Sequence, residues 1–188
     1  MSLDEILQLD KVASSVKKID LFVSQKTKFS KEYMKAIAYK GIVLHELGKT
    51  NDALKLLYEY VPDINKMDSE GVISLCSSII EITLNVGAFD QAAKYIKIKQ
   101  GYLPISRASE YIKDALTLYL AKKDYENAKL SLKEYLDDDI TKEEEIYALE
   151  KLAEIYYMER DYDEYLKIIP KLASNSLKNA CPSWMTRI

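Results

Sequence analysis

The chain has 188 residues, of which 48% are apolar and 30% are charged, which is enough for one domain or one short array of repeats. Its formal net charge of -3 gives no reason to expect direct binding to nucleic acid or to an anionic membrane surface. Only 5 Gly and 4 Pro are present, too few for the many turns of an all-β fold, so the composition favours packed helices.

Cysteine usage and hydropathy indicate the compartment. Cys76 and Cys181 lie far apart and lack the spacing of metal ligands or of a disulfide framework, so we expect free thiols in a reducing compartment. No apolar run is long enough to span a membrane. Asp4 and Glu5 interrupt the stretch where a signal peptide would lie. These features predict a cytoplasmic protein with no membrane partner.

Residues 1–30 form an amphipathic stretch ahead of the repeats. Its apolar residues fall largely on one helical face, namely Ile6, Leu7, Leu9, Val12, Ala13, Val16, Ile19, Phe22 and Val23. Two interpretations are open: the stretch is a helical cap over the first repeat, or it is the second half of a degenerate hairpin.

Four segments between residues 31 and 173 share one pattern. In each, an amphipathic helix ends at Gly, Lys or Arg, a tight turn follows, and the next helix begins near acidic or amide residues. An aromatic residue follows the turn in the last three segments, at Phe89, Tyr125 and Tyr162. A small residue three places later allows close helix approach, as at Ala92 and Ala128. The pattern predicts four helix hairpins.

The segments recur at near-constant spacing, slightly longer than the roughly 34 residues of a plain tetratricopeptide repeat (TPR). The motifs that resemble the TPR family are Leu47-Gly48 with Ala53, Val86-Gly87-Ala88-Phe89 with Ala92, Asp124-Tyr125 with Ala128, and Asp161-Tyr162. The resemblance covers most of the chain. It implies an all-α fold, a right-handed solenoid of antiparallel helix hairpins, in which the first helices line a concave surface.

The resemblance has departures in the middle and last repeats. The small residue expected within each first helix is present as Gly41 and Ala153, but Ile80 and Leu116 stand in the middle repeats. Tyr165 replaces alanine in the last hairpin. We therefore expect irregular repeats on an intact architecture.

No group of residues indicates catalysis. His45 is the only histidine, and glycine-rich phosphate loops and a Gly-x-Ser-x-Gly motif are absent. The acidic clusters at 137–139 and 143–145 lack the spacing of a calcium loop, so we interpret them as an exposed loop and a helix start. We expect no enzyme activity, no cofactor and no metal site.

The resemblance also implies which residues face the concave surface. The candidate site residues for a protein or peptide partner are His45, Ser77, Glu81, Asn85, Lys113, Thr117, Glu150, Glu154 and Tyr157. In the first repeat, Lys35, Ala38 and Ile42 share that surface with His45. The alternative interpretation is a solvated helix face without a ligand. A basic clamp for an acidic peptide terminus is not expected, because Glu110 and Asp114 occupy two of its positions and would repel a carboxylate.

Three functional hypotheses follow. The first is a non-catalytic protein- or peptide-binding scaffold, an interaction module of a bacterial cytoplasmic signalling protein. The second is an N-terminal sensory domain of a larger enzyme, such as a nucleotide cyclase, or of a transcription regulator. The third is a self-associating structural protein, a homodimer formed through the tail at residues 174–188 with Trp184 and Met185. The tail itself has two open interpretations, a cap that folds back or a truncation point of a longer protein.

Overall fold

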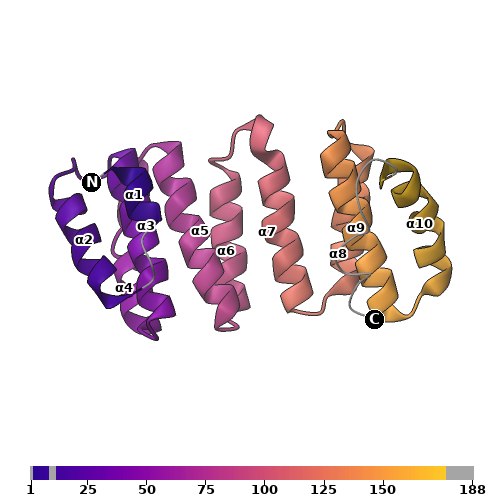
Figure 1. Ribbon diagram of the computed structural model, residues 1–188, viewed down its shortest axis with the longest axis horizontal. Helices are drawn as coiled ribbons and strands as arrows, with labels where there is room; N and C mark the ends of the chain where they lie inside the picture. Colours follow the sequence, from indigo (N-terminus) through magenta and orange to yellow (C-terminus); the bar gives the residue numbers. More distant parts are fainter. Residues whose placement is uncertain (1, 9–11, 177–188) are drawn as a thin grey trace. The chain divides into compact units, whose positions relative to one another are not determined.

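The computed structural model describes residues 2–8 and 12–176, and these residues contain helices and no strand (Figure 1). The all-α prediction is confirmed for this part of the chain. In chain order the helices are α1 (Leu3–Leu7), α2 (Ala13–Ser24), α3 (Lys31–Glu46), α4 (Thr50–Tyr58), α5 (Ser69–Asn85), α6 (Phe89–Gln100), α7 (Ala108–Ala121), α8 (Tyr125–Asp137), α9 (Lys142–Glu159) and α10 (Tyr162–Ser176). Two 3₁₀ segments, Val61–Lys66 and Ile105–Arg107, follow α4 and α6.

The chain divides into two compact units, one before and one after the junction of Tyr111 and Ile112 within α7. In the first unit, α3 packs against α2, α4 and α5, and α5 packs against α6 (Figure 1). In the second unit, α9 packs against α8 and α10. The helix pairs α3 with α4, α5 with α6, and α9 with α10 therefore lie side by side, and each pair coincides with one of the repeat segments.

The turn inside each repeat segment has the same backbone geometry four times. Gly48, Gly87, Lys123 and Arg160 adopt left-handed φ values of 76°, 74°, 58° and 61°. In each case the next backbone N–H donates to a carbonyl five residues earlier, from Lys49 to Leu44, Ala88 to Thr83, Asp124 to Tyr119 and Asp161 to Tyr156, at 2.8–2.9 Å. This bond satisfies a carbonyl that the helix end leaves without a partner. The Gly, Lys or Arg of the sequence pattern therefore marks one recurring turn.

Small residues hold the paired helices close together. Ala53, Ala92 and Ala128 are fully buried, as expected for small residues between packed helices. At Gly41, a Cβ atom would lie only 2.8 Å from Cδ1 of Leu57, so a larger residue at this position requires the Leu57 side chain to move. Ile80 and Leu116, at the equivalent positions of the middle repeats, are also buried.

Each unit has its own apolar core. In the first unit, α1 and α2 bury Ile6, Ile19 and Phe22 against Ala36 and Val43 of α3. In the second unit, the core collects residues of four helices, including Leu116 of α7, Leu132 of α8, Leu152 and Ile155 of α9, and Leu172 of α10. Helices α1 and α2 therefore cover a side of α3 that would otherwise face solvent.

The acidic clusters lie where the sequence places them. Asp137 is the last residue of α8, and the cluster at 143–145 lies in the first turn of α9, where carboxylates suit the helix dipole. Thr141 and Glu144 form a reciprocal capping box at that helix start. The interpretation as a loop and a helix start is confirmed.

The remaining sequence expectations concern the cysteines, membrane-spanning helices and the C-terminal tail. Cys76 is buried and forms no disulfide within the described residues. None of the helices in residues 2–8 and 12–176 combines the length and the hydropathy needed to cross a bilayer. The tail predictions on Cys181, Trp184 and Met185 concern residues 177–188, which lie outside the described part of the chain.

Candidate functional site

The nine candidate residues divide between the two units, and each set is described by itself. Those of the first unit are His45 on α3 and Ser77, Glu81 and Asn85 on α5; those of the second unit are Lys113 and Thr117 on α7 and Glu150, Glu154 and Tyr157 on α9.

Two candidate residues of the first unit, His45 and Asn85, are in contact. Nδ1 of His45 lies 2.9 Å from the hydroxyl oxygen of Thr50, and Nε2 lies 3.4 Å from the amide nitrogen of Asn85. The two ring nitrogens thus face one partner each, and the tautomer of the imidazole decides which of them donates. The half-buried imidazole thus fixes the C-terminal end of α5 against the turn between α3 and α4.

Four polar side chains of α5, two of them exposed and two half-buried, form a row. Ser77, Glu81 and Asn85 are spaced four residues apart, so they share one face of the helix, and Ser74 continues that face by one turn. Glu81 and Asn85 are exposed, whereas Ser74 and Ser77 are half-buried. We refer to these four residues as the α5 row. From Ser74 to Asn85 the row is about 17 Å long, which matches about five residues of extended peptide.

Two neighbouring positions do not belong to the accessible surface. Ala38 and Ile42 of α3, which the TPR resemblance places on the inner surface, are only 4% and 7% exposed. They fill the seam between the first helices of the two hairpins instead of facing a ligand. The prediction that these two residues are open to a partner is wrong, because α3 and α5 pack directly against each other.

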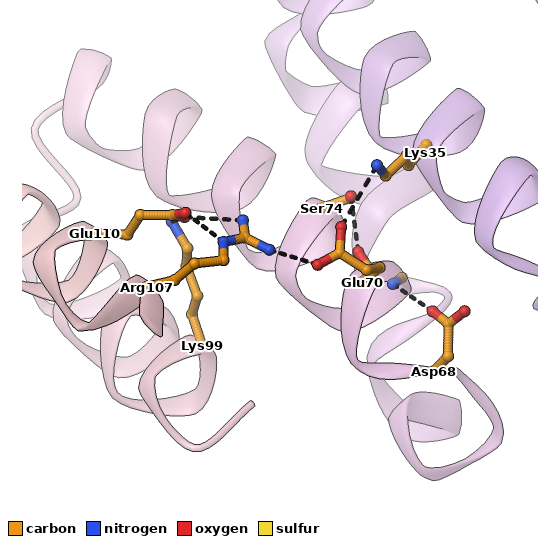
Figure 2. Close-up of polar contacts among 8 residues, drawn as sticks. Lys35, Asp68, Glu70, Ser74, Lys99, Arg107 and Glu110 are labelled. Carbon is orange, nitrogen blue, oxygen red and sulfur yellow. Dashed lines mark hydrogen bonds and ion pairs between the residues drawn. The ribbon is translucent and has the colours of Figure 1, made fainter. Parts of the chain in front are cut away.

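At the opposite end of the α5 row lies a network of five charged side chains (Figure 2). Arg107 donates to Glu70 of α5 and, through two nitrogens, to Glu110 of α7; its Nη2 lies 3.0 Å from Oε2 of Glu110. Lys35 of α3 lies 3.5 Å from Glu70, and Lys99 of α6 lies 3.9 Å from Glu110. We refer to these residues as the charged network. It joins α3, α5, α6 and the start of α7 within the first unit.

The network holds its members in their charged forms. Partial burial alone would raise the pKa of Glu70, but the Arg107 charge and the hydrogen bond from Lys35 lower it below its ordinary value of 4.5. The hydrogen bond to Glu110, together with the Glu70 charge, raises the pKa of Arg107. Lys99 is only 5% exposed, and its amine therefore requires the nearby carboxylate of Glu110.

Two polar contacts join α3 and α5, one near each end of the helix pair. Lys35 and Glu70 lie near the beginnings of α3 and α5, and His45 and Asn85 lie at their ends. The two helices are therefore parallel, as first helices of consecutive hairpins should be. The α5 row lies between these anchors, so its helix is fixed at both ends.

In the second unit, the candidate residues of α7 contact other residues of that unit. The Lys113 amine lies 5.2 Å from the centre of the Tyr147 ring, a cation–π contact between α7 and α9. The Thr117 hydroxyl donates to the Lys113 carbonyl at 2.8 Å, so it can only accept from a ligand. Burial raises the pKa of Tyr147.

The candidate residues of α9 have different environments. Glu154 accepts a hydrogen bond from Lys151 at 2.7 Å, and Glu150 is half-buried. Tyr157 is 43% exposed, and its ring centre lies 6.0 Å from that of Tyr162 and 5.7 Å from that of Tyr165. Tyr157 thus belongs to an aromatic cluster at the turn between α9 and α10.

The second unit also contains an open pocket of about 490 Å³. It is lined by Lys133, Leu136, Asp137, Asp138, Asp139, Ile140, Glu145, Leu149 and Lys171. None of the nine candidate residues lines it. Within the described residues, no group of His, Cys, Asp or Glu has an arrangement that could hold a metal ion. The pocket mixes acidic and basic side chains, so it does not select a ligand by charge.

Sequence reasoning missed three residues of the charged network, Glu70, Lys99 and Arg107. Arg107 lies between hairpins and pairs with a carboxylate 37 residues away, so no local spacing reveals the contact.

Comparisons of the chain with protein-family models, with curated proteins and with solved structures find no match.

Proposed function

We propose that this chain is a non-catalytic scaffold that binds an extended segment of a partner protein along the α5 row. The observation that carries the proposal is the row itself, a line of exposed and half-buried polar side chains on one face of a helix that has contacts at both ends. The same turn in all four repeat segments supports a TPR-like solenoid of hairpins as the framework.

The α5 row offers what an extended backbone needs. A peptide in this conformation presents N–H and C=O groups that must be bonded when water is displaced. Ser77 and Asn85 provide hydroxyl and amide groups along the row, and a side-chain amide can both donate to and accept from a peptide backbone. Glu81, between them, favours a Lys or Arg of the partner, although such an exposed ion pair contributes little by itself.

Rigidity of the row increases the affinity that these groups can supply. Binding is weakened by the entropy lost when mobile groups become ordered. Here His45 fixes one end of α5 and the charged network fixes the other, so the backbone that carries the row is already ordered. Binding to the α5 row therefore costs less conformational entropy than binding to a flexible loop would.

The test uses peptides selected from a displayed random library against the immobilised full-length chain. The peptide of the tightest clone is labelled, and its dissociation constant is measured by fluorescence anisotropy. Two hydrogen bonds at about 1 kcal/mol each predict that Ser77→Ala/Asn85→Ala weakens binding roughly thirty-fold. The matched control, Gln91→Ala/Lys97→Ala, changes two exposed polar residues of α6 and should bind like the wild type.

Two results would overturn the proposal. One is a selection that enriches no binding peptide. The other is a selected peptide that binds the Ser77→Ala/Asn85→Ala variant as tightly as the wild type. Circular dichroism of both variants shows whether the helices are retained, so that loss of binding is not confused with unfolding.

A further inference from the structure

Helix α2 and the turn that leads into α3 are basic, although the chain as a whole is acidic. Residues 12–31 contain one acidic residue, Asp20, and five lysines, namely Lys17, Lys18, Lys26, Lys28 and Lys31. All five lysines are exposed. This stretch therefore has a formal net charge of +4 in a chain whose net charge is -3. The positive charge is concentrated on one end of the first unit.

The described part of the chain does not compensate this charge. Asp20 is engaged by Lys40 of α3, whose amine lies 2.6 Å from its Oδ1. None of the five lysines forms an ion pair with another described residue. Elsewhere lysines do pair, as Lys129 does with Glu126 and Glu159 at 2.7 and 2.8 Å. The five positive charges therefore repel each other, and an external anion would relieve this repulsion.

Two of the lysines flank an exposed leucine. Lys17 and Lys18 precede Leu21 by four and three residues, so they lie one helical turn away from it, one to each side. Leu21 is 61% exposed. The opposite side of α2 buries Ile19 and Phe22 in the core beside α3, and α2 lies at the outer edge of the first unit (Figure 1). We refer to Lys17, Lys18 and Leu21 as the α2 face.

The positive charge continues past the end of α2. The Lys26 amine lies 4.8 Å from the centre of the Phe22 ring, and the Lys28 amine lies 4.9 Å from the centre of the Phe29 ring. Such cation–π contacts hold the amines in place without neutralising them. Phe29 is itself held by an edge-on contact with Tyr60, at 6.3 Å between ring centres. An anionic partner of the α2 face therefore meets further ordered positive charge beyond the helix end.

Three classes of anionic partner differ in how they fit the α2 face. A membrane surface is bound by helices that insert several large apolar side chains, but Ile19 and Phe22 are buried and only Leu21 remains. Nucleic acid offers phosphates to the lysines, but the leucine between them contacts no phosphate. An acidic helix of another protein matches both features, because it presents carboxylates and an apolar side chain on one face.

We propose that the α2 face docks an acidic amphipathic helix of a partner protein. An apolar residue of that helix covers Leu21, and its Asp or Glu residues one turn away pair with Lys17 and Lys18. Exposed ion pairs contribute little affinity each, so the charges mainly select the partner and speed up its association. The surface is separate from the α5 row, and the inference does not rest on binding there.

The test uses a displayed library of helical peptides whose outward positions are randomised among Asp, Glu, Lys, Arg and Leu at equal frequency. The bait is the full-length chain with Ser77→Ala/Asn85→Ala, so binding at the α5 row does not affect the outcome. The proposal predicts that the enriched clones are acidic and carry leucine between the acidic positions. The selection itself thus reports the charge that the surface prefers.

The dissociation constant of the tightest acidic clone is then measured by fluorescence anisotropy. Lys17→Ala/Lys18→Ala should weaken binding roughly ten-fold, as expected for the loss of two exposed ion pairs. Raising the salt concentration from about 50 to about 500 mM should weaken binding as well, because the charges are screened. Leu21→Ala should weaken binding and leave its salt dependence unchanged.

A matched control removes the same charge elsewhere. Lys94→Ala/Lys97→Ala replaces two exposed lysines of α6 and should bind the acidic clone like the bait. Every substituted side chain is exposed, so the helices should be retained, and circular dichroism of each variant checks this.

Four results would overturn the proposal. The first is a selection that enriches no clone, and the second is one that enriches basic or uncharged clones. The third is an acidic clone that binds Lys17→Ala/Lys18→Ala as tightly as the bait. The fourth is binding to phosphatidylserine vesicles or to duplex DNA that Lys17→Ala/Lys18→Ala abolishes while no acidic peptide binds, which would assign the α2 face to another class of partner.

Discussion

The close contact between α3 and α4 at Gly41 allows a quantitative test of the hairpin packing. A Cβ atom on this residue would lie 2.8, 2.9 and 2.9 Å from Cδ1, Cδ2 and Cγ of Leu57. Carbon atoms prefer separations of about 3.5–4.0 Å, so the leucine must move. Leu57 is fully buried, which leaves little room for that movement. Gly41→Ala should therefore introduce overpacking at the centre of the first hairpin.

The sign of the effect depends on Leu57. In an unobstructed helix, Gly→Ala stabilises by about 1 kcal/mol, whereas overpacking a core costs about 1–3 kcal/mol. We expect Gly41→Ala to destabilise the first unit by roughly 1 kcal/mol as the balance of these effects. Leu57→Ala alone should cost about 2–5 kcal/mol. In that background Gly41→Ala should stabilise by about 1 kcal/mol, so the coupling is about 2 kcal/mol.

Urea denaturation of the four proteins, followed by circular dichroism, measures this cycle. Hydrogen exchange of peptides from α3 and α4 assigns the change to the first unit, because a chain with two units need not unfold in one step. Gly101→Ala is the matched control, since its Cβ would meet only a backbone oxygen at 3.4 Å. Equal effects of Gly41→Ala with Leu57 present and absent would refute the packing argument.

Three further predictions concern a helix cap, a turn and a carboxylate. Thr141→Ala removes the capping box of α9 and should destabilise the second unit by about 1 kcal/mol in urea denaturation; an unchanged midpoint would contradict the cap. Arg160→Gly relieves a left-handed φ of 61° and should stabilise that unit by up to about 1 kcal/mol, whereas a loss of stability would show that the turn is not strained. The pKa of Glu70 is lower in the folded state than its ordinary value of 4.5, so its contribution is present above pH 4.5 and is lost as the pH falls through the folded-state pKa. Glu70→Gln should therefore flatten the decrease in stability below pH 4.5, and an unchanged slope would contradict the charged network.

The turns between helices could be predicted from the sequence because local chemistry determines them. Gly48 and Gly87 permit the left-handed turn, and polar residues that suit a helix start follow each turn. At Lys123 and Arg160 the same turn forms without glycine, because the flanking helices and the recurring hydrogen bond impose it. The buried alanines are local signals as well, since a small residue at a fixed distance from the turn is visible in the sequence.

The candidate site could be predicted only as a set of positions. Helical spacing places Ser77, Glu81 and Asn85 on one face, and the structure shows them there. The contact of Asn85 with His45 could not be derived, because it depends on how closely α3 and α5 pack. The same packing buries Ile42, which repeat spacing alone places on the accessible surface.

The most direct test of the scaffold proposal is a map of amide chemical shifts. The isotope-labelled full-length chain is titrated with the selected peptide, and shifts are assigned residue by residue. The account predicts that the largest changes follow the α5 row from Ser74 to Asn85 and include His45. Changes confined to α4 and α6, with the α5 row unaffected, would contradict the account and place the binding surface on the second helices of the hairpins.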